Sequence, residues 1–475
     1  MIPEVCVKSL NLIPVPKSIR QGEAMHTFCA AVYSVDFPAE AKAFAELVCK
    51  LHSADVKTAN GGVMLSCDGT LSEGEYRISC SDKGLFAYAS ERKGAGYALT
   101  TLVQLISFSD NGLMCPEVEI QDRPDRDHRA LMIDLARKWH PFPVLLEYVD
   151  LCRLYKINYL HLHFADNESY TLPSSELPRL STPDRSYTAE EIGRLVAYAE
   201  ERGVELIPEI EAPGHAKAMI LAYPELFGHV GNDPDKLCDR LICVGKPGIS
   251  ETLSRWVDEV IALFPHSRYL HIGGDEARIH AWNACDDCRA YMKTHGIEDE
   301  YALYTHFIKL MTDLVIEKGR TPLVWEGFPR KGAEALSRET VVSVFESLYH
   351  TSPELLCEGF KMINSSWQPL YIVPRRHWSA EYIYEWNIFR WENWWEKSKA
   401  YEKPIEIPPS EQVLGGELCA WGCTYGQEIG LVRENLAALA ERTWNVTPII
   451  STEDFRRSLN AIIPIAEKLT VSEVI

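Results

Sequence analysis

Residues 129–164 read RALMIDLARKWHPFPVLLEYVDLCRLYKINYLHLHF, and the pattern of this stretch decides the fold class. It predicts an apolar strand at Ala130–Leu135, a helix with apolar residues at helical spacing at Val144–Tyr155, and a second strand at Asn158–Phe164. Strands that alternate with helices of this length are typical of a parallel α/β sheet. The stretch is therefore the first strand–helix–strand unit of an α/β domain.

The same alternation continues almost to the end of the chain. The further predicted strands are Val204–Ile210, Tyr269–Ile272, Pro322–Trp325, Val341–Phe345, Lys361–Asn364 and Val413–Leu418, and the further helices are Thr188–Arg202, Ser250–Phe264, Tyr301–Lys318 and Leu431–Arg442. The helix at Thr188 begins with a Thr-x-x-Glu capping box that ends at Glu191. Eight strands in this order favour a (β/α)8 TIM barrel over a doubly wound sheet, although alternation alone does not separate the two.

The positions of polar and aromatic side chains favour the barrel. Residues that can do chemistry follow the carboxyl ends of predicted strands, which is where barrel enzymes build their sites. They are His163, Asp166, Glu209, Glu211, Asp275, Glu276, Trp325, Glu326 and Trp421. A chance distribution would place as many at the amino ends. We therefore predict an α/β (β/α)8 barrel with a site at its carboxyl face.

The chain divides into two parts at the polar segment Gln121–Asp127, which Pro124 interrupts. Residues 1–122 combine a predicted helix with short alternating strands, which indicates a small α+β domain. Residues 123–475 make up the predicted catalytic barrel. Within it, residues 371–412 are too aromatic for a disordered linker, so we expect an ordered insertion over the mouth of the site. Its tryptophans are Trp378, Trp386, Trp391, Trp394 and Trp395.

Composition argues against several classes of partner. The net charge of −20 opposes binding to nucleic acid or to an anionic membrane surface. No uninterrupted apolar stretch is long enough to span a bilayer. The amino terminus, MIPEVCVK, lacks the basic start and apolar run of a secretory signal. With 14 cysteines and no visible signal, we expect reduced thiols in the cytoplasm rather than a disulfide framework.

Four cysteines form a pattern that has two interpretations. Cys285 and Cys288 make a CxxC motif, and Cys238 and Cys243 could complete a set of four thiolates. The spacing of the second pair does not match the usual zinc knuckles. Free buried thiols are therefore favoured over a structural metal ion.

Asp275 and Glu276 are the strongest candidates for a working site. They follow an apolar strand and two residues without side chains, Gly273 and Gly274, which allow unusual backbone torsions and close approach of a ligand. Consecutive side chains at an extended strand end point in roughly opposite directions, so the two carboxylates can take different roles around one substrate. This arrangement favours a catalytic pair over two solvated acids in a loop.

Three functions are compatible with this pair. The first is glycoside hydrolysis, in which a 2-acetamido group of the substrate attacks the anomeric carbon, Glu276 serves as acid and base, and Asp275 stabilises the developing ring. The second is a metal-dependent barrel hydrolase, because His161, His163 and His215 resemble part of a ligand set. The third is a non-catalytic sugar-binding protein that uses the same aromatic side chains.

The chain resembles the β-N-acetylhexosaminidases of glycoside hydrolase family 20. The resemblance covers nearly the whole chain, including the small first domain. The matching stretches are RALMIDLARKWHP (129–141), KINYLHLHFAD (156–166), IPEIEAPGH (207–215), HIGGDE (271–276), Val324–Trp325, Tyr371, GGELCAW (415–421) and AERTW (440–444). Several motifs in the right order are far more specific than any single one.

This resemblance implies an exo-acting, retaining enzyme that removes terminal β-linked GlcNAc or GalNAc through an oxazolinium intermediate, without a metal or cofactor. Glu276 would be the acid and base, Asp275 would orient the acetamido group, and Tyr371 would donate a hydrogen bond to its oxygen. Asp166 and His215 would support Glu276. The sugar would be held by Arg129, Trp325, Trp421, Phe345 and Trp391. The partners would be β-HexNAc-terminated glycans, and a homodimer is compatible with the sequence.

The chain departs from the family pattern where outer sugar hydroxyls are usually held. Val373 replaces an acid two residues after the site tyrosine, and Gly422 and Cys423 follow Trp421 where an acid is common. Phe345 stands where a pocket tryptophan is expected on the sixth strand. We therefore expect altered selectivity at C4 or C6 of the sugar: galacto as well as gluco substrates, or a sugar substituted at an outer position.

Overall fold

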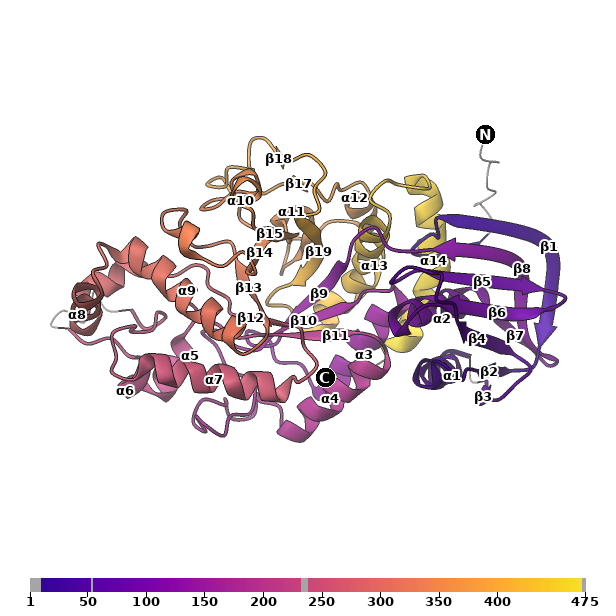
Figure 1. Cartoon of the computed structure of the whole chain (residues 1–475), viewed down its shortest axis with the longest axis horizontal. Coiled ribbons are helices and arrows are strands. Elements are labelled where there is room, and N and C mark those ends of the chain that lie inside the picture. The colour runs from indigo at the N-terminus through magenta and orange to yellow at the C-terminus, as the bar shows by residue number, and fades with distance from the viewer. Residues whose placement is uncertain (1–9, 53, 232–237, 472–475) are drawn as a thin grey trace.

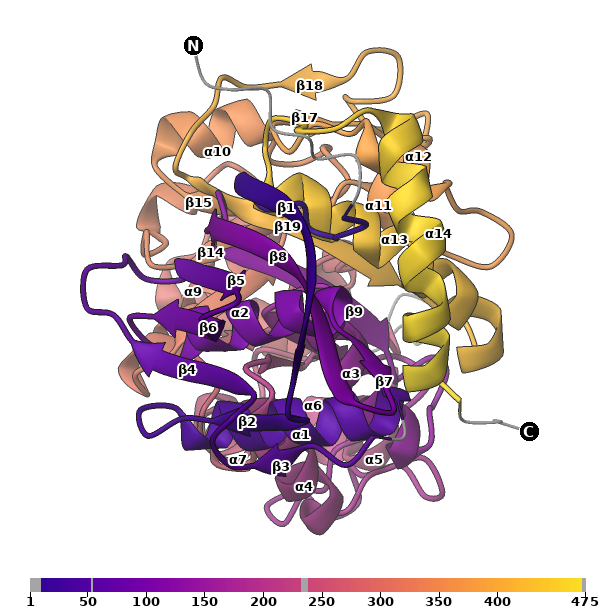
Figure 2. The same ribbon diagram turned by 90° about the vertical axis from the view of Figure 1, so that its right-hand side faces the viewer.

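The computed structural model describes residues 10–52, 54–231 and 238–471. These residues form a small sheet domain beside a larger barrel, and both parts are seen side-on in Figure 1. Figure 2 looks from the side of the small domain, whose strands lie in front of the barrel. Among the described residues, no helix combines the length and the apolar character needed to cross a membrane.

The small domain is one sheet in the strand order β1-β8-β5-β6-β4-β2-β3, with β7 paired to β8. Helices α1 (Pro38–His52) and α2 (Arg92–Leu105) pack against each other and against its strands. The side chains of β5 and β6 alternate between buried and partly exposed, as expected for a sheet that is covered on one face. The strands are β1 (Ser18–Phe28), β2 (Ala31–Tyr33), β3 (Lys57–Thr58), β4 (Val63–Cys67), β5 (Tyr76–Ser81), β6 (Gly84–Ala89), β7 (Ser107–Ser109) and β8 (Gly112–Asp122).

The larger part is a closed barrel of eight parallel strands, which confirms the predicted fold class. β15 pairs with β19, and β19 pairs with β9, so the sheet has no free edge. Each predicted strand is present within a residue or two. The barrel strands are β9 (His128–Asp134), β10 (Tyr159–His163), β11 (Glu205–Glu209), β12 (Tyr269–His271), β13 (Thr321–Trp325), β14 (Val341–Val344), β15 (Lys361–Asn364) and β19 (Val413–Ala420).

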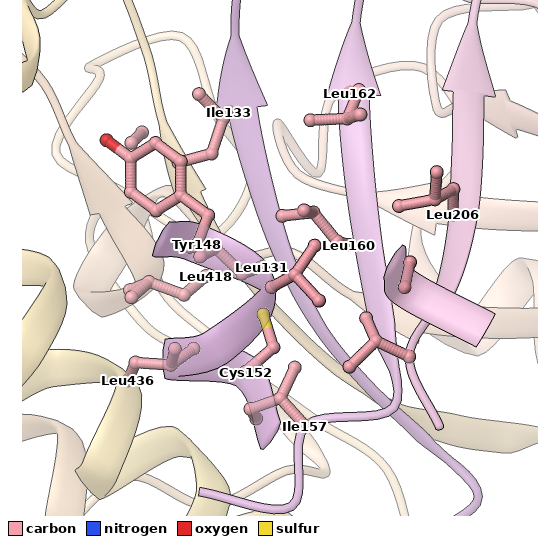
Figure 3. Close-up of a cluster of buried hydrophobic side chains, with 14 of the residues drawn as sticks. Leu131, Ile133, Tyr148, Cys152, Ile157, Leu160, Leu162, Leu206, Leu418 and Leu436 are labelled. Carbon is pink, nitrogen blue, oxygen red and sulfur yellow. The ribbon is translucent and has the colours of Figure 1, made fainter. Parts of the chain in front are cut away.

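Helices surround the barrel and bury its outward-facing side chains. Leu131, Leu160 and Leu162 point from β9 and β10 toward Tyr148 and Cys152 of helix α3, as Figure 3 shows. The helices between barrel strands include α3 (Phe142–Leu154), α4 (Ala189–Glu201), α7 (Ile249–Leu263), α9 (Glu300–Glu317), α10 (Ser352–Glu358) and α13 (Tyr425–Trp444). The capping box at Thr188 is present and starts α4.

The last two helices differ from the predictions. Helix α13 begins at Tyr425 rather than Leu431, because Thr424 and Gln427 form a second capping box nearly two turns earlier. Helix α14 (Thr452–Leu469) was not predicted, although Ser451 caps it and its buried residues recur at helical spacing. It contacts α13 and α3 of the barrel and α1 of the small domain, and therefore joins the two parts.

The interior of the barrel changes character from one end to the other. At the amino end it is filled by apolar side chains such as Tyr159, Ile207 and Tyr269. The next residues inward on the same strands are charged or ionisable: His161, Glu209 and His271. The aromatic side chains of the carboxyl end lie above them. The predicted site is therefore supported from below by a buried layer of ion pairs.

Candidate active site

The turn after β12 presents Asp275 and Glu276 and depends on two glycines. Gly273 and Gly274 have φ angles of +66° and +95°, which side chains rarely allow. A Cβ atom at Gly273 would lie 1.9 Å from Oε2 of Glu211, so the carboxyl group of Glu211 occupies the space that glycine leaves. The hydroxyl of Tyr304 donates a hydrogen bond to the carbonyl oxygen of Gly274. The turn is thus fixed from both sides.

Asp275 is buried between two other strand-end turns. A Cβ at Gly327 would lie 2.6 Å from its Cα, and a Cβ at Gly214 would lie 2.6 Å from its carbonyl oxygen. Burial raises the pKa of Asp275 to about 6, and the nearby negative charge of Glu276 acts in the same direction. Its Oδ1 atom is buried and has no hydrogen-bond partner. This carboxylate is held in place with one acceptor atom unused.

Glu276 has the opposite environment. Its side chain is 51% exposed, and its φ of +47° turns it away from Asp275. Its Oε2 atom lies 3.4 Å from Nε2 of His215. This hydrogen bond holds the pKa of Glu276 below its usual value. Of the two adjacent acids, one is enclosed and the other faces solvent, so the structure makes them chemically unequal.

His215 connects Glu276 to a buried acid. Its Nδ1 atom lies 3.2 Å from Oδ1 of Asp166, while its Nε2 faces Glu276. Burial alone would lower the pKa of His215, but hydrogen bonds with Asp166 and Glu276 raise it well above its usual value. The φ of +50° at His215 aims the ring at the site from the turn that follows β11. The predicted pair of Asp166 and His215 is therefore assembled behind Glu276.

A buried ionic network supports Asp166 in turn. Nε2 of His163 lies 3.0 Å from Oδ2 of Asp166, and Nδ1 of His163 lies 2.5 Å from Oε2 of Glu209. Burial would raise the pKa of Asp166, but hydrogen bonds from His163 and His215 hold it well below its usual range. The opposite charges on His163 and Glu209 raise the pKa of His163 to about 9 despite its burial. The chain from Glu209 to Glu276 thus alternates in charge.

Aromatic side chains wall the same end of the barrel. Trp325, Phe345, Tyr371 and Trp421 belong to one cluster, which brings four predicted site residues together. The ring of Trp325 lies 5.8 Å from that of Trp421 and 5.5 Å from that of Phe345, and the ring of Tyr371 lies 6.2 Å from that of Trp421. The indole N–H of Trp325 donates to Oε1 of Glu209 at 2.5 Å, so the ionic layer also fixes this wall.

The prediction that Arg129 grips the sugar is wrong. Arg129 is at the amino end of β9, opposite the site, and is fully buried. Its guanidinium donates to the carbonyl oxygens of Lys156 and Arg126 and to the hydroxyl of Tyr97 in the small domain. The two ends of a strand of seven residues lie far apart. An arginine near the start of β9 therefore cannot reach the carboxyl face. Arg129 instead fastens the barrel to the small domain.

Arg137, which the sequence interpretation missed, is the arginine that lies at the site. It follows β9 at the carboxyl end, and its Nη2 lies 2.6 Å from Oδ2 of Asp166. The same guanidinium lies 4.8 Å from the ring centroid of Trp421 and bonds to Asp134. The signal was present, because Arg137 lies within the same motif that begins with Arg129.

The prediction that Trp391 lines the site is also wrong. Trp391 lies in strand β17 (Arg390–Trp391), paired with β18 (Ile405–Glu406), and its side chain is buried in the main apolar core. The insertion does reach the aromatic cluster, but through Trp378 and Trp394. The ring centroid of Trp367, from the short helix α11 (Trp367–Leu370), lies 6.0 Å from that of Phe345. Trp367 therefore adds an indole beside the position where the sixth strand has a phenylalanine.

Glu346 is a further site residue that the sequence did not reveal. It follows Phe345 directly at the end of β14 and is buried. Burial raises its pKa to about 9, and the charges of Glu326, Glu276 and Asp275 act in the same direction. Its nearness to Asp275 and Glu276 comes from the barrel closure, which no local pattern records.

The histidines do not form the metal set that the hydrolase alternative requires. His161, His163 and His215 do not converge on one point. His161 pairs instead with Glu417 at 2.9 Å and with Glu209 at 3.1 Å, and His163 and His215 share Asp166. The carboxylates that face these histidines account for them as an ionic network beneath the site.

Comparison with known proteins decides the family. The model for the glycosyl hydrolase family 20 catalytic domain matches residues 127–447, and the model for domain 2 of the same family matches residues 9–123. The chain belongs to glycosyl hydrolase family 20. Named relatives of this chain include beta-hexosaminidases.

Two of these relatives show how far the likeness extends. A beta-hexosaminidase of Vibrio furnissii is 28% identical over 462 residues, which span 88% of this chain and 74% of the relative. A beta-hexosaminidase of Porphyromonas gingivalis is 28% identical over 359 residues, or 67% of this chain but only 45% of the relative. This chain therefore spans less than half the length of that relative.

A solved structure supports the fold. The GH20 exo beta-N-acetylglucosaminidase of Vibrio harveyi, in complex with N-acetylglucosamine, superimposes with a TM-score of 0.84 at 24% identity. The match covers 98% of this chain and 78% of that chain. Both the barrel and the small domain therefore follow the architecture of this family.

Replacing the two arginines separately should test which of them serves the site. Arg137→Ala should lower kcat/KM on an aryl β-hexosaminide by on the order of 10²-fold, because Asp166 loses its cation and His215 its alignment. Arg129→Lys should leave kcat and KM of the folded protein unchanged but destabilise it by about 1–3 kcal/mol, because buried carbonyl oxygens lose donors. Steady-state kinetics and thermal unfolding measure the two effects. A rise in KM for Arg129→Lys at unchanged stability would contradict the assignment.

Proposed function

We propose that this protein is an exo-acting, retaining β-N-acetylhexosaminidase that removes terminal β-linked GlcNAc or GalNAc by substrate assistance. The observation that carries the proposal is the inequality of the two adjacent acids. Asp275 is enclosed and rigid, whereas Glu276 is exposed and backed by His215 and Asp166. A group that exchanges protons needs access, and a group that stabilises charge needs fixed geometry.

The first step of the proposed reaction closes a ring on the substrate. The acetamido carbonyl oxygen attacks the anomeric carbon while the glycosidic C–O bond breaks, and Glu276 gives its proton to the leaving oxygen. Asp275 accepts the amide N–H and stabilises the positive charge of the oxazolinium ring. Tyr371, buried beside Trp421, donates a hydrogen bond from its hydroxyl to the acetamido oxygen and aligns it. No protein nucleophile is required.

In the second step water opens the ring. Glu276, now a carboxylate, takes a proton from the water as its oxygen attacks the anomeric carbon, and the C–O bond to the acetamido oxygen breaks. Attack occurs on the face that the leaving group vacated, so the configuration is retained. Binding of substrate would cover the exposed carboxyl of Glu276 and raise its pKa, because burial disfavours the charged form. This shift would favour the acid form of Glu276 in the substrate complex, which the first step requires.

The relatives support the choice of substrate class. The relatives from Porphyromonas gingivalis and Vibrio furnissii are named beta-hexosaminidases, and the Vibrio harveyi structure holds N-acetylglucosamine. The two alternative functions, a metal-dependent hydrolase and a sugar-binding protein, predict different experimental results. A metal-dependent hydrolase would lose activity with chelator and regain it with zinc, and a sugar-binding protein would bind β-HexNAc glycosides without hydrolysing them.

The departure at the outer hydroxyls has a structural counterpart in Glu346. Val373 packs within the aromatic cluster, and Cys423 is buried, so neither supplies a charged group. Glu346 has a raised pKa near 9 through burial and is therefore neutral at pH 7. A neutral carboxyl can both donate to and accept from a sugar hydroxyl. We infer that Glu346 replaces the missing acids and relaxes the distinction between gluco and galacto substrates.

The two acid variants should respond differently to the leaving group. Glu276→Gln should cost about 10²–10⁴-fold in kcat on a methylumbelliferyl glycoside and much less on a dinitrophenyl glycoside, because the better leaving group needs no proton. Asp275→Asn should cost a similar factor on both, because Asp275 acts on the acetamido group and not on the leaving oxygen. Kinetics on matched 2-acetamido-β-glycosides test this. An equal loss on both substrates for Glu276→Gln would show that it is not the general acid.

Activity should fall on the acid side of pH 6. The raised pKa of Asp275, about 6 because of burial, means that the free enzyme takes up a proton there as the pH drops. A protonated Asp275 has no charge with which to stabilise the oxazolinium ring, so kcat/KM should decline about tenfold for each pH unit well below 6. The pH profile of kcat/KM on enzyme shown to be stable at each pH measures this. A level profile below pH 6 would contradict the role of Asp275.

Selectivity should depend on Glu346. Glu346→Ala should change the ratio of kcat/KM values for aryl GlcNAc and GalNAc glycosides by about tenfold, because one hydrogen bond to a hydroxyl is worth about 1–2 kcal/mol. Glu346→Gln should keep the ratio, since the amide also donates and accepts. A strong gluco preference in the unchanged protein, or an unaltered ratio in the alanine variant, would count against this inference.

A further inference from the structure

Three cysteine sulfurs converge away from the proposed catalytic residues. Sγ of Cys243 lies 3.5 Å from Sγ of Cys285 and 3.5 Å from Sγ of Cys288. All three side chains are buried and all three thiols are free. Cys285 is the N-cap of helix α8 (Asp286–His295), and Cys288 lies in the first turn of that helix. Cys243 lies in the loop before α7. Two segments more than 40 residues apart therefore meet through sulfur.

The spacing of these sulfurs fits a tetrahedral metal ion. Thiolates bound to zinc at about 2.3 Å lie about 3.8 Å from one another. A disulfide would join two of the three sulfurs and leave the third unpaired. The three sulfurs lie within 4.8 Å of one another, so a single ion could contact all of them.

His229, whose nitrogens are not among the atoms that lie within 4.8 Å of one another at the three sulfurs, is a candidate for the fourth ligand. Both of its ring nitrogens are buried and have no hydrogen-bond partner. The backbone on each side of it is fastened to the cysteine-bearing segments. Cys243 N–H donates to the carbonyl oxygen of Phe227 at 2.8 Å, and Asp286 N–H donates to that of Val230 at 2.7 Å. An unpaired buried imidazole at this point needs a partner.

We propose that Cys243, Cys285, Cys288 and His229 form a structural zinc site. Thiolate and imidazole ligands select zinc over the harder divalent cations, and four protein ligands leave no position for a substrate. Binding would release the thiol protons to solvent as the sulfur–zinc bonds form. The site is separate from the proposed hydrolysis, which uses no metal.

The zinc would join two segments that shape the active site. Ile242 N–H donates to the carbonyl oxygen of Pro213 at 3.0 Å, so the Cys243 segment supports the turn that carries His215. The indole N–H of Trp282 donates to the carbonyl oxygen of Ile242 at 2.9 Å, and Trp282 lies between Glu276 and Cys285 in the chain. An ion at the three sulfurs would hold the His215 turn and the segment after Glu276 in one unit.

Metal analysis of the purified full chain tests the site. After dialysis against metal-free buffer, about one zinc ion per chain is expected by mass spectrometry. Cys285→Ser and Cys288→Ser should each lower the zinc content at least about tenfold and lower Tm. Cys152→Ser is the matched control, since it also buries a hydroxyl but lies among apolar side chains of α3, and should keep the zinc.

A second measurement does not require the variants to fold. Titrating the unchanged protein with a mercurial reagent should release zinc in step with the modification of three thiols, detected with a chromogenic chelator. Cobalt in place of zinc should show the visible bands of tetrahedral thiolate coordination. Zinc-free protein with three freely reactive thiols, or with a Cys285–Cys288 disulfide, would overturn the proposal.

The fourth ligand has its own test. His229→Ala should weaken zinc binding and alter the cobalt bands. Cys238→Ser should do neither, because Cys238 is a free, partly exposed thiol outside the group of three sulfurs. Loss of zinc in Cys238→Ser with retention in His229→Ala would overturn the assignment of His229. Since zinc content is read without substrate, its failure and a failure of the proposed hydrolysis are distinguishable.

Discussion

The site depends on the charge of one buried carboxylate, Glu209. His163, His161 and His271 lie 2.5–3.1 Å from its oxygens, and the indole of Trp325 donates to it. Burial alone would raise the pKa of Glu209, but these histidines hold it well below its usual range. A buried charge is tolerated only when it is paired and hydrogen-bonded, so the layer has to be complete to be stable. Removing one partner would leave the others as unpaired charges.

Through hydrogen bonds, this buried layer fixes the side chains of the site relative to the rigid strands of the barrel. Glu209 aligns Trp325, which is part of the aromatic wall, and His163, which aligns Asp166. Asp166 in turn aligns His215 and binds Arg137. Each step is a short polar contact between the ends of neighbouring strands. The orientation of Glu276 at the surface is therefore set by a residue in the centre of the barrel.

The candidate site also requires strained backbone, which the surrounding packing maintains. His215 and Glu276 both have positive φ angles, a conformation that costs non-glycine residues on the order of 1 kcal/mol or more. The close approach of Gly214 and Gly327 to Asp275 shows that three strand-end turns interlock at this point. Such strain persists because alternatives would break the interlocking turns. It places two adjacent acids in different environments, which an ordinary strand end would not do.

Much of this arrangement followed from the sequence. The alternation of strands and helices predicted the barrel, and the residues at strand ends predicted Asp275, Glu276, Asp166 and His215 as neighbours. These predictions rest on local periodicity and on the rule that parallel strands share a carboxyl face. The two errors have a common cause. Arg129 and Trp391 were judged by residue type, whereas their roles depend on which end of β9 and which face of the insertion they occupy.

The sequence by itself determined the fold class, the face that carries the site and the identity of the acids, because each of these is encoded in short-range spacing. Only the tertiary structure decided which arginine serves the site, which tryptophans form its wall, and that Glu346 lies near the acids. It also decided that three cysteines from distant segments meet. These facts depend on barrel closure and loop packing, which bring together residues that no spacing along the chain relates.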